Sequence, residues 1–499
     1  MLQRVARTYP ERFALRWTDP DAPAASPCVL TYGQLAGQSQ ALATHLRDVF
    51  RIAAGERVAW LGLNHPMQIV LLLALARLGA IWVPLNHRLA VAEWTTVLAD
   101  CAPRLLVHDR AFASAAASLA QNQGSSLAAL QADALPDASP TWDDTPVPDA
   151  WDTPTLLVYT SGTTGLPKAA VHTQGNLLAN MAMAAQVQQI QASDTVLTVL
   201  PLFHVGGLCI QTLPALSVGA TVLLQARFDA PTVLATLAVE RPTLTLQVPA
   251  TLKALSEHPT WSATDLGSLR AVWAGSSILP PAPVAAFHAR GVPVCNVYGS
   301  TETGPFSIAL APEHAMDHTG SCGWPAPGAD VKLCDANGQV VPDGEVGELC
   351  IRAPNVVRRY WPDQAAVDDA AYFHSGDLAR QAADGSYTVV GRAKDMIISG
   401  GENIYPAEIE NVLLAHPWVS ECCVIGQRDA RWGEVAAAVM VFGAEAPVGE
   451  DWPTALQEHL NGKLARYKWP RQWHRVEALP KTALGKVQKA ALLDLLNAA

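Results

Sequence analysis

The segment from Thr155 to Lys168 constrains the fold more than any other, because an apolar run passes there directly into a loop of hydroxyl and glycine residues. Residues 155–159, Thr-Leu-Leu-Val-Tyr, predict a short buried strand. Gly162 and Gly165 then allow the backbone to turn tightly. Successive backbone N–H groups in such a loop form an anion-binding nest, and Lys168 adds a positive charge. The segment therefore predicts a strand followed by a phosphate-binding loop.

Hydroxyl donors favour a polyphosphate ligand for this loop over an ordinary surface turn. From Tyr159 to Gly165 every residue is glycine or carries a hydroxyl group, and Ser161, Thr163 and Thr164 add donors to the backbone N–H groups. A bare Gly-x-x-Gly would not exclude a turn without a ligand. The spacing differs from that of a P-loop, which has four residues between its glycines and a Lys-Ser/Thr ending. A P-loop NTPase is therefore disfavoured.

Length and composition indicate a globular protein with more than one domain. The chain has 499 residues, of which 50% are hydrophobic, so it can bury a large core. A net charge of −11 without a basic tail argues against a general affinity for nucleic acid or anionic membranes. Nine cysteines, an odd number without a C-x-x-C pair, predict neither a disulfide framework nor a zinc site. The N-terminus lacks the apolar core of a secretory signal, so we expect a cytoplasmic protein.

One segment, Met67 to Leu85, is apolar enough to consider as a membrane span. It carries Gln68 and Arg77 and is interrupted by Gly79 and by a proline at position 84. These residues disfavour a spanning helix and stable membrane insertion. A buried helix followed by a strand fits the pattern better.

Helical and strand-like patterns alternate over residues 1–110 and predict an α/β layer structure. A helix starts within 30–35, a strand covers 57–62, and another helix covers 68–78. Residues 111–150 are rich in Ala, Ser, Asp and Pro and predict a weakly structured connection.

Further strand-like runs end at residues that could line a ligand site. The run 196–204 ends at His204, which periodicity alone would assign to a hydrogen-bonded core histidine. The runs 243–249 and 269–273 precede the small-residue turn 274–277, Ala-Gly-Ser-Ser, which would admit a flat ring.

The run 294–304 supplies groups that suit a nucleotide and a metal ion, although a solvated turn is the simpler alternative. Tyr298 could stack on adenine, and Thr301 could donate to an α-phosphate. Glu302 could hold Mg²⁺, since hard cations prefer oxygen ligands. Farther along, Asp377 could accept bonds from ribose hydroxyls, although an isolated Ser-Gly-Asp is usually a simple turn.

A second, smaller domain begins near residue 396. Pro406 stands at a predicted helix start, strands are predicted at 422–426 and 435–442, and a helix is predicted at 452–464. The chain then reaches Lys486 in a loop, where it would be one of many surface lysines if considered alone.

Five motifs together resemble those of the AMP-forming acyl- and aryl-CoA synthetases, in the same order along the chain. They are residues 159–168, 203–207, 296–304, 373–377 and 391–410, and the loop with Lys486 follows them. This adenylate-forming superfamily also contains luciferase-like proteins and peptide-synthetase adenylation domains. Within the motifs, the amino-acid sequence is most similar to those of bacterial fatty-acyl-CoA and hydroxycinnamoyl-CoA (feruloyl-CoA) synthetases. One departure, Ala169 where many relatives have glycine, is expected to be tolerated.

The resemblance implies an α/β fold with two domains. Residues 1–392 would form a large domain of stacked α/β subdomains that binds ATP and the acid. Residues 393–499 would form a small mobile α+β domain that turns about a hinge near Lys394. The active site would lie in the cleft between them.

The resemblance also implies roles for individual residues. ATP would be held by Thr160, Ser161, Gly162, Thr163, Thr164, Gly165 and Lys168 at its phosphates, by Gly275, Ser276, Ser277, Tyr298 and Gly299 around adenine, and by Asp377 and Arg392 at the ribose. Lys486, Glu302, Thr301 and His204 would be catalytic, with Glu302 as the Mg²⁺ ligand and Lys486 bridging the carboxylate and the α-phosphate. CoA would contact Gly400, Gly401, Trp432, Tyr467 and Arg471.

The implied acid pocket is mostly apolar. It comprises His204, Val205, Gly207, Trp273, Ala274, Phe306 and Ile308. Without an evident cation for a second carboxylate, this set favours a hydrophobic monocarboxylic acid, either fatty or aromatic. The expected reaction uses ATP and Mg²⁺ to form an acyl-AMP with release of pyrophosphate, and then transfers the acyl group to CoA.

Two alternatives stay open at this point. The acyl group could pass to a carrier protein in place of CoA, or the chain could be a catalytically silent nucleotide-binding protein. The presence of Lys486, Glu302 and Asp377 disfavours the silent protein. The sequence leaves the oligomeric state open, with a homodimer as one option.

Overall fold

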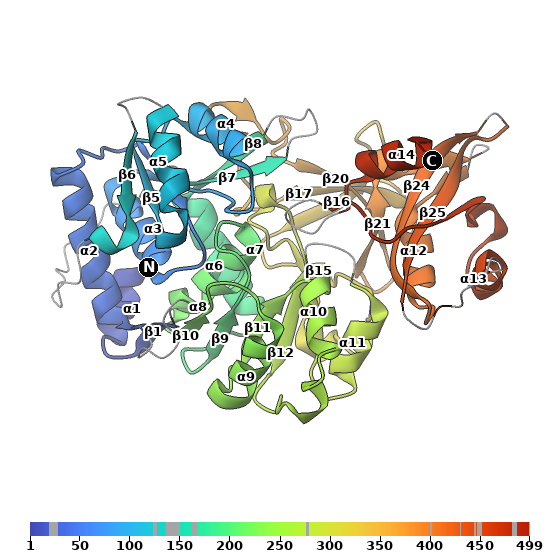
Figure 1. The fold of residues 1–499 in the computed structure, drawn as a ribbon, viewed down its shortest axis with the longest axis horizontal. Coiled ribbons are helices and arrows are strands. Elements are labelled where there is room, and N and C mark those ends of the chain that lie inside the picture. Colours follow the sequence, from blue (N-terminus) through green and yellow to red (C-terminus); the bar gives the residue numbers. More distant parts are fainter. Residues whose placement is uncertain are drawn as a thin grey trace.

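The computed structural model confirms the α/β fold and forms four β-sheets among the residues that it describes (Figure 1). The described residues are 1–18, 28–122, 127–135, 150–161, 167–275, 279–399, 402–429, 431–443, 446, 452–481 and 487–498.

The first sheet has eight strands in the order β19-β18-β8-β7-β4-β3-β5-β6. Its strands are β3 (Arg57–Leu61), β4 (Ile81–Pro84), β5 (Leu105–His108), β6 (Ala128–Gln131), β7 (Pro154–Ser161), β8 (Pro167–Thr173), β18 (Arg359–Tyr360) and β19 (Gln364–Ala365). Strands β3 to β6 pair in parallel, and β7 joins β4 in the same direction. Strands β7 and β8 pair antiparallel, so the described ends of the phosphate-loop motif lie opposite each other.

The second sheet has nine strands in the order β15-β14-β13-β12-β11-β9-β10-β1-β2. They are β1 (Phe13–Trp17), β2 (Cys28–Thr31), β9 (Thr195–Thr198), β10 (Thr221–Leu224), β11 (Leu244–Gln247), β12 (Ala271–Gly275), β13 (Val294–Tyr298), β14 (Ile308–Ala309) and β15 (Trp324–Pro325). The parallel strands β11, β12 and β13 lie side by side, so the small-residue turn and the Tyr298 motif follow neighbouring strand ends.

Two smaller sheets complete the fold. The third has the order β16-β17-β20-β21, with β16 (Asp330–Cys334), β17 (Val346–Arg352), β20 (Phe373–Gln381) and β21 (Tyr387–Arg392). The fourth contains β22 (Ile397–Ser399), β23 (Glu402–Ile404), β24 (Val419–Asp429), β25 (Gly433–Phe442) and β26 (Gln472–Arg475). Figure 1 shows the C-terminal elements, in orange and red, standing beside the larger body, with the third sheet between them.

Helices cover these sheets. In the large domain they are α1 (Leu2–Thr8), α2 (Tyr32–Asp48), α3 (Pro66–Leu78), α4 (Val91–Cys101), α5 (Ala113–Asn122), α6 (Gln174–Val187), α7 (Val205–Gly207), α8 (Leu213–Val218), α9 (Ala230–Glu240), α10 (Pro249–Ser256) and α11 (Pro281–His288). The small domain has α12 (Pro406–Leu414), α13 (Trp452–Leu460) and α14 (Lys489–Ala498). A π-helical turn, η4 (Leu208–Thr212), joins α7 to α8, and short 3₁₀ turns include η6 (Thr301–Thr303) and η8 (Ala393–Asp395).

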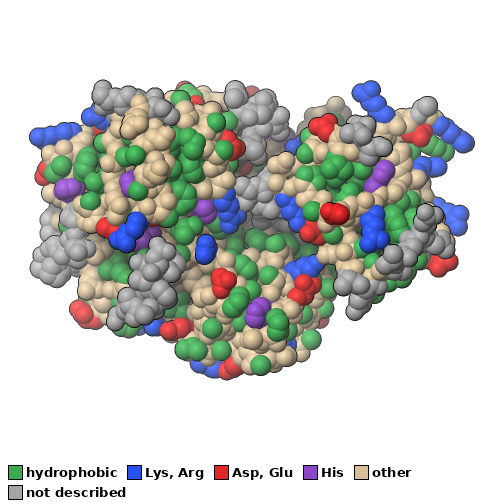
Figure 2. Space-filling model, in the orientation of Figure 1, with side chains coloured by type: hydrophobic (Ala, Val, Ile, Leu, Met, Phe, Trp, Pro, Cys, Tyr) green, Lys and Arg blue, Asp and Glu red, His purple; other side chains and the backbone are tan. Residues whose placement is uncertain are grey.

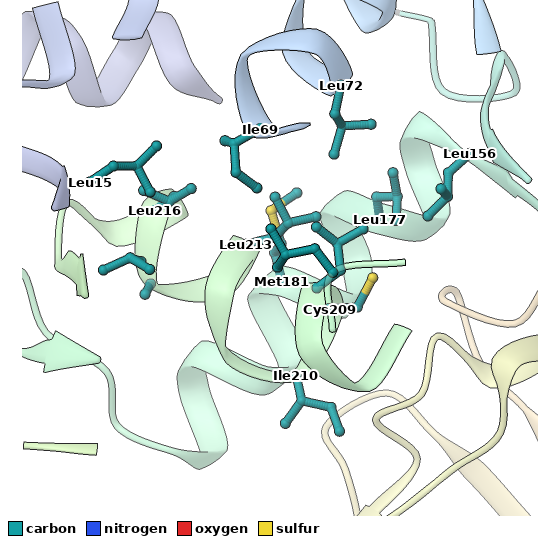
Figure 3. Close-up of a cluster of buried hydrophobic side chains, with 14 of the residues drawn as sticks. Leu15, Ile69, Leu72, Leu156, Leu177, Met181, Cys209, Ile210, Leu213 and Leu216 are labelled. Carbon is teal, nitrogen blue, oxygen red and sulfur yellow. The ribbon is translucent and has the colours of Figure 1, made fainter. Parts of the chain in front are cut away.

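The main core joins the two large sheets through α3, α6 and α8 (Figure 3). Leu72 of α3, Leu177 and Met181 of α6 and Leu213 of α8 all belong to this buried cluster. A fully buried side chain of this kind contributes about 1.5–3 kcal/mol relative to an exposed one. The helices that this core holds also carry the turn after His204, so packing fixes one wall of the candidate site.

The segment 67–85 forms α3 and β4, as its interruptions predicted. His65 caps the helix through Nδ1, Pro66 occupies its first turn, and Gly79 ends it with φ of 68° in the left-handed region. All four residues of β4 are buried. Within the described ranges, no helix combines the length and apolarity that crossing a membrane requires.

The prediction for residues 111–150 is partly wrong. Residues 113–122 form α5 and residues 128–131 form β6, which pairs in parallel with β5. The Ala-rich composition that suggested a loose connection instead supplies a small-residue helix whose Ala116 and Leu119 are buried. Residues 123–126 and 136–149 lie outside the described part.

Candidate active site

Tyr298, Asp377 and Arg392 lie together, although they come from two different sheets. Tyr298 ends β13, and Asp377 on β20 faces Arg392 on β21 as a direct cross-strand partner. The Tyr298 hydroxyl donates to Asp377 Oδ2 at 2.8 Å, and Arg392 Nε lies 2.7 Å from Asp377 Oδ1. Burial, with the nearby Asp377 charge, raises the pKa of Tyr298 well above its ordinary value, so the phenol stays a donor. The three residues form one polar cluster beside the end of β13.

A second cluster joins Glu302, Tyr360 and Lys168. The Tyr360 hydroxyl donates to Glu302 Oε1 at 2.9 Å, and Lys168 Nζ lies 5.6 Å from the centre of the Tyr360 ring. Tyr360 reaches this position because β18 pairs with β8. Burial and the Glu302 charge raise the pKa of Tyr360, which keeps its hydroxyl protonated. The sequence analysis did not predict a role for Tyr360, because a two-residue strand carries no signal of the strand with which it pairs.

The hairpin β7–β8 places Thr160 and Lys168 opposite each other. They are direct cross-strand partners, and the Thr160 hydroxyl donates to the Lys168 carbonyl at 3.3 Å. Thr301 begins η6 next to Glu302 and is buried. The loop end of the hairpin and η6 therefore carry the described parts of the candidate phosphate and metal site.

Packing alone requires glycine at two of the positions that were predicted to surround adenine. A Cβ at Gly275 would lie 2.4 Å from the Val297 carbonyl oxygen, and one at Gly299 would lie 1.7 Å from the Pro305 carbonyl oxygen. Side chains are excluded at both positions by neighbouring backbone. This packing accounts for glycine at both positions without a ligand, and the adenine role stays a prediction.

His204 caps the short helix α7. Its Nδ1 accepts a hydrogen bond from the Gly206 N–H at 3.0 Å. The neutral ring therefore carries its proton on Nε2, which makes that nitrogen a donor. Gly207 lies in the next turn, where a Cβ would stand 2.3 Å from the Pro201 carbonyl oxygen. In this structure His204 caps α7 through Nδ1, and contact of its Nε2 with the acid stays a prediction.

The candidate acid residues divide among three buried clusters. Val205, Trp273 and Phe306 share the main core, where the Trp273 and Phe306 ring centres lie 6.0 Å apart at 45°. Ala274 packs on the opposite face of the second sheet, and Ile308 belongs to a cluster beside the third sheet. Trp273 Nε1 is buried with no hydrogen-bond partner among the described residues. The structure thus packs Trp273 and Phe306 together as fully buried core side chains and places Ala274 and Ile308 in other clusters.

A cavity of about 220 Å³ lies elsewhere, among α3, α6 and α8. Its lining includes Leu72, Arg77, Leu177, Met181 and Leu213. None of the candidate nucleotide or acid residues lines it, so it does not belong to the candidate site.

On the small domain, Trp432 lies close to two guanidinium groups. The Arg471 guanidinium carbon is 4.5 Å and that of Arg431 is 4.9 Å from its ring centre. Tyr467 is 45% exposed, with Lys468 Nζ 5.8 Å from its ring. A ring beside cations on an exposed surface suits a nucleotide with phosphates. The sequence analysis did not predict a role for Arg431, although its position next to Trp432 could have indicated a contact with CoA.

The expected hinge, Lys394, lies in η8 between the third and fourth sheets. Its neighbour Asp395 forms an ion pair with Lys489 at 3.2 Å. Several predicted residues lie outside the described part, namely Gly162, Thr163, Thr164, Gly165, Ser276, Ser277, Gly400, Gly401 and Lys486, as does the side chain of Ser161.

The described groups fit ATP and Mg²⁺ chemically. Each oxygen of the Asp377 carboxylate already accepts one bond and retains capacity for a ribose hydroxyl. Glu302 is bonded to Tyr360 through Oε1, and its Oε2 can serve as an oxygen ligand for a hard cation. Lys168 lies beside the same tyrosine, where its positive charge can neutralise phosphate.

Comparisons with known proteins agree with a site for ATP. The model of the AMP-binding enzyme family matches residues 2–361, and that of the AMP-binding enzyme C-terminal domain matches residues 408–486. Indoleacetate–CoA ligase of Aromatoleum aromaticum is 40% identical over 98% of this chain and 96% of its own length. Feruloyl-CoA synthase of an Amycolatopsis species is 40% identical over 92% of each chain.

Comparison with a solved structure also indicates an AMP-forming synthetase. The o-succinylbenzoate coenzyme A synthetase of Bacillus subtilis, in complex with ATP and magnesium ion, superposes with a TM-score of 0.85. It is 30% identical, and the match covers 99% of both chains. Family models, relatives and structure together show that this chain belongs to the AMP-binding enzymes, as an adenylate-forming acid–CoA ligase.

Proposed function

We propose that the protein activates an aromatic monocarboxylic acid as its acyl-AMP and transfers the aryl-containing acyl group to CoA. The observation that carries this choice is the pair of buried aromatic rings of Trp273 and Phe306 among the candidate acid residues, whose centres lie 6.0 Å apart. A planar substrate ring placed beside this pair would gain offset or edge-to-face contacts that an alkyl chain cannot make. The names of the relatives, indoleacetate–CoA ligase and feruloyl-CoA synthase, support the same class of substrate.

In this proposal the first half-reaction depends on positioning and charge neutralisation. A carboxylate oxygen attacks the α-phosphorus of ATP, and pyrophosphate leaves. Both reactants are anionic, so Lys486 reduces their repulsion by bridging them, while Lys168 and the Thr301 hydroxyl hold phosphate oxygens. Mg²⁺, when held by Glu302, would neutralise phosphate charge.

The remaining described groups hold the nucleotide and the acid. Asp377 and Arg392 bind the ribose, and the Tyr298 ring covers adenine while its hydroxyl keeps Asp377 in place. His204 borders the acid with its Nε2–H. No side chain is required to accept a proton in the adenylation step, because the attacking carboxylate is already ionised.

The second half-reaction uses the small domain in a different orientation. The CoA thiolate attacks the acyl carbon, and the bond to AMP breaks. Rotation about Lys394 withdraws Lys486 and brings the loop with Gly400 and Gly401 beside the acyl-AMP. Trp432 and Arg471 receive the CoA nucleotide, and basic side chains spread over this domain in Figure 2 favour its phosphates.

The domain boundary belongs to the same proposal. The third sheet ends at Arg392, the hinge turn covers residues 393–395, and the fourth sheet begins at Ile397. These bounds support domains of residues 1–392 and 393–499. A cytoplasmic location and a homodimer complete the proposal, to be tested by fractionation and by analytical ultracentrifugation.

The decisive experiment measures pyrophosphate and acyl-CoA from purified protein with ATP, Mg²⁺, CoA and a panel of acids. The panel contains arylacetic, hydroxycinnamic and fatty acids of several chain lengths. We expect both products with aromatic acids at higher kcat/KM than with any fatty acid. A preference for fatty acids would reject the aromatic substrate. Pyrophosphate without acyl-CoA would indicate a carrier-protein acceptor, and ATP binding without either product would indicate a silent protein.

A further inference from the structure

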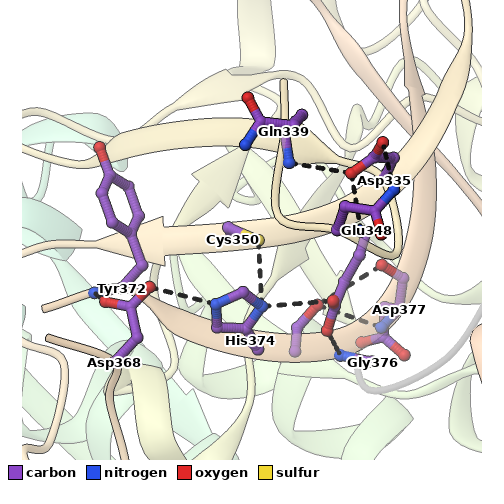
Figure 4. A network of polar contacts seen from close by, with 11 residues as sticks. Asp335, Gln339, Glu348, Cys350, Asp368, Tyr372, His374, Gly376 and Asp377 are labelled. Carbon is purple, nitrogen blue, oxygen red and sulfur yellow. Dashed lines mark hydrogen bonds and ion pairs between the residues drawn. The ribbon is translucent and has the colours of Figure 1, made fainter. Parts of the chain in front are cut away.

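Three side chains with metal-binding atoms converge on one face of the third sheet (Figure 4). Glu348 and Cys350 are two residues apart on β17, so both point to the same face. His374 on β20 is the direct cross-strand partner of Cys350. The ligand atoms of all three lie within 4.8 Å of one another.

Two of the three spacings between these atoms match the edges of a tetrahedral zinc site. Cys350 Sγ lies 3.4 Å from His374 Nδ1, which lies 3.3 Å from Glu348 Oε2. Zinc bonds of about 2.3 Å to sulfur and about 2.1 Å to nitrogen and oxygen, at tetrahedral angles, give edges of about 3.6 and 3.4 Å. A cation could therefore enter with little movement of the side chains.

Neighbouring groups already orient two of the ligands. His374 Nε2 lies 3.2 Å from Asp368 Oδ2, and this carboxylate would hold the ring through a proton on Nε2 once Nδ1 binds an ion. Glu348 Oε1 accepts a hydrogen bond from the Gly376 N–H at 2.8 Å, which directs Oε2 toward Cys350 and His374. A carboxylate on the far side of a histidine is the usual support of a metal-binding imidazole.

We propose that Glu348 Oε2, Cys350 Sγ and His374 Nδ1 form a binding site for Zn²⁺, separate from the Mg²⁺ site of the reaction. A sulfur, nitrogen and oxygen donor set selects a borderline cation over Mg²⁺ or Ca²⁺. Cys350 is buried, whereas the side chains of Glu348 and His374 are 26% and 43% exposed. The fourth position thus faces solvent and takes a water molecule.

Binding would release the Cys350 thiol proton to solvent, because the thiolate is the ligand. The ion would join β17 to β20 close to the part of β20 that carries Asp377. The cysteine spacing gave no sign of this site, because its ligands come from two strands whose Cys350 and His374 are 24 residues apart.

Cobalt provides a direct test with the full-length protein. Metal-free protein is titrated with Co²⁺, and absorption reports thiolate bonding. We expect a sulfur-to-cobalt charge-transfer band that saturates at one Co²⁺ per chain and disappears when Zn²⁺ is added. Cys350→Ser should abolish the band, and Asp368→Asn should weaken binding about 10–100-fold.

Two variants control for incidental binding. His318→Ala removes a similar histidine–carboxylate pair, since His318 Nε2 lies 3.0 Å from Asp384 Oδ2, and Cys28→Ser removes an exposed cysteine. Both should retain the band. No band in the wild-type protein, or a band that persists in Cys350→Ser, would overturn the site.

A stability measurement keeps the test valid if Cys350→Ser folds poorly. Zn²⁺ should raise the Tm of the wild-type and His318→Ala proteins but not that of Glu348→Gln, whose substituted side chain is partly exposed and nearly isosteric. An equal rise in Glu348→Gln would reject Glu348 as a ligand and with it the proposed site.

Discussion

Tyr298 and Asp377 are 79 residues apart in the sequence, yet a hydrogen bond of 2.8 Å joins the phenol to the carboxylate where the second and third sheets meet. Arg392 holds the other carboxylate oxygen at 2.7 Å. The carboxylate is therefore oriented by groups from two sheets before any nucleotide arrives. Preorganised groups of this kind bind a ligand without a further cost of ordering.

The Tyr298→Phe variant should weaken ATP binding while leaving the aromatic ring in place. A hydrogen bond to a charged group contributes about 1.5–3 kcal/mol, so the KM for ATP should rise about 10-fold or more. Initial rates at varied ATP measure the effect. The matched control is Tyr387→Phe, which removes a hydroxyl bonded to the Val331 carbonyl in the third sheet. Equal KM changes in both variants would reject a specific role for Tyr298.

Tyr360→Phe should make the first half-reaction more sensitive to Mg²⁺. The Tyr360 hydroxyl orients Glu302 through Oε1, and without it the carboxylate can rotate away from the metal position. The Mg²⁺ concentration for half-maximal pyrophosphate release should rise several-fold, by about 1 kcal/mol. Tyr372→Phe, which loses a similar bond to Asp330, serves as the control. An unchanged Mg²⁺ dependence would show that Tyr360 does not position Glu302.

Local patterns predicted the elements well where one segment contains all the information. The helix of segment 67–85 follows from its cap and its terminal glycine, and the strand before Tyr298 follows from its apolar run. Residues 113–122 misled the prediction, because an Ala- and Ser-rich stretch can be a loop or a helix until a neighbour buries one face.

Long-range partners were the part of the site that the sequence could not supply. Tyr360 and Glu302 are 58 residues apart, and their contact depends on the pairing of β18 with β8. The cluster of Glu348, Cys350 and His374 likewise exists only through strand register. Ordered motifs can reveal a family, whereas contacts between strands require the fold.

Lys486→Ala should nearly abolish formation of acyl-AMP from ATP and acid. In the proposed mechanism this lysine acts only in the adenylating orientation, so thioester formation from supplied acyl-AMP and CoA should stay within a few-fold of the wild-type rate. Pyrophosphate release and acyl-CoA formation measure the two halves separately. Lys481→Ala is a control on the described edge of the same loop, where Lys481 pairs with Glu421 at 2.6 Å. Equal loss in both halves would reject this role for Lys486.

Trp273→Phe should change the choice of acid without changing ATP binding. The smaller ring leaves space next to Phe306, so kcat/KM for bulky aromatic acids should change several-fold while the KM for ATP stays constant. Trp60→Phe, a fully buried tryptophan of the first sheet, controls for general loosening of the core. If Trp273→Phe altered all acids by one common factor, Trp273 would not be a specificity residue.

Acid should destabilise the protein partly through His172. This side chain is fully buried on β8, and burial lowers its pKa to about 4 from an ordinary value of 6.5. Between these two values the unfolded chain binds the proton and the folded chain does not. Folding stability therefore falls as the pH falls from about 6.5 to about 4, by at most about 3 kcal/mol from this residue.

The His172→Gln variant should flatten this part of the pH dependence, because glutamine does not titrate. Urea unfolding between pH 4.5 and 7 measures the slope of the unfolding free energy against pH. We expect a lower stability of the variant at pH 7 and a smaller loss on acidification. His314→Gln, at an exposed position, should keep the wild-type slope. A wild-type slope in His172→Gln would show that other groups cause the acid sensitivity.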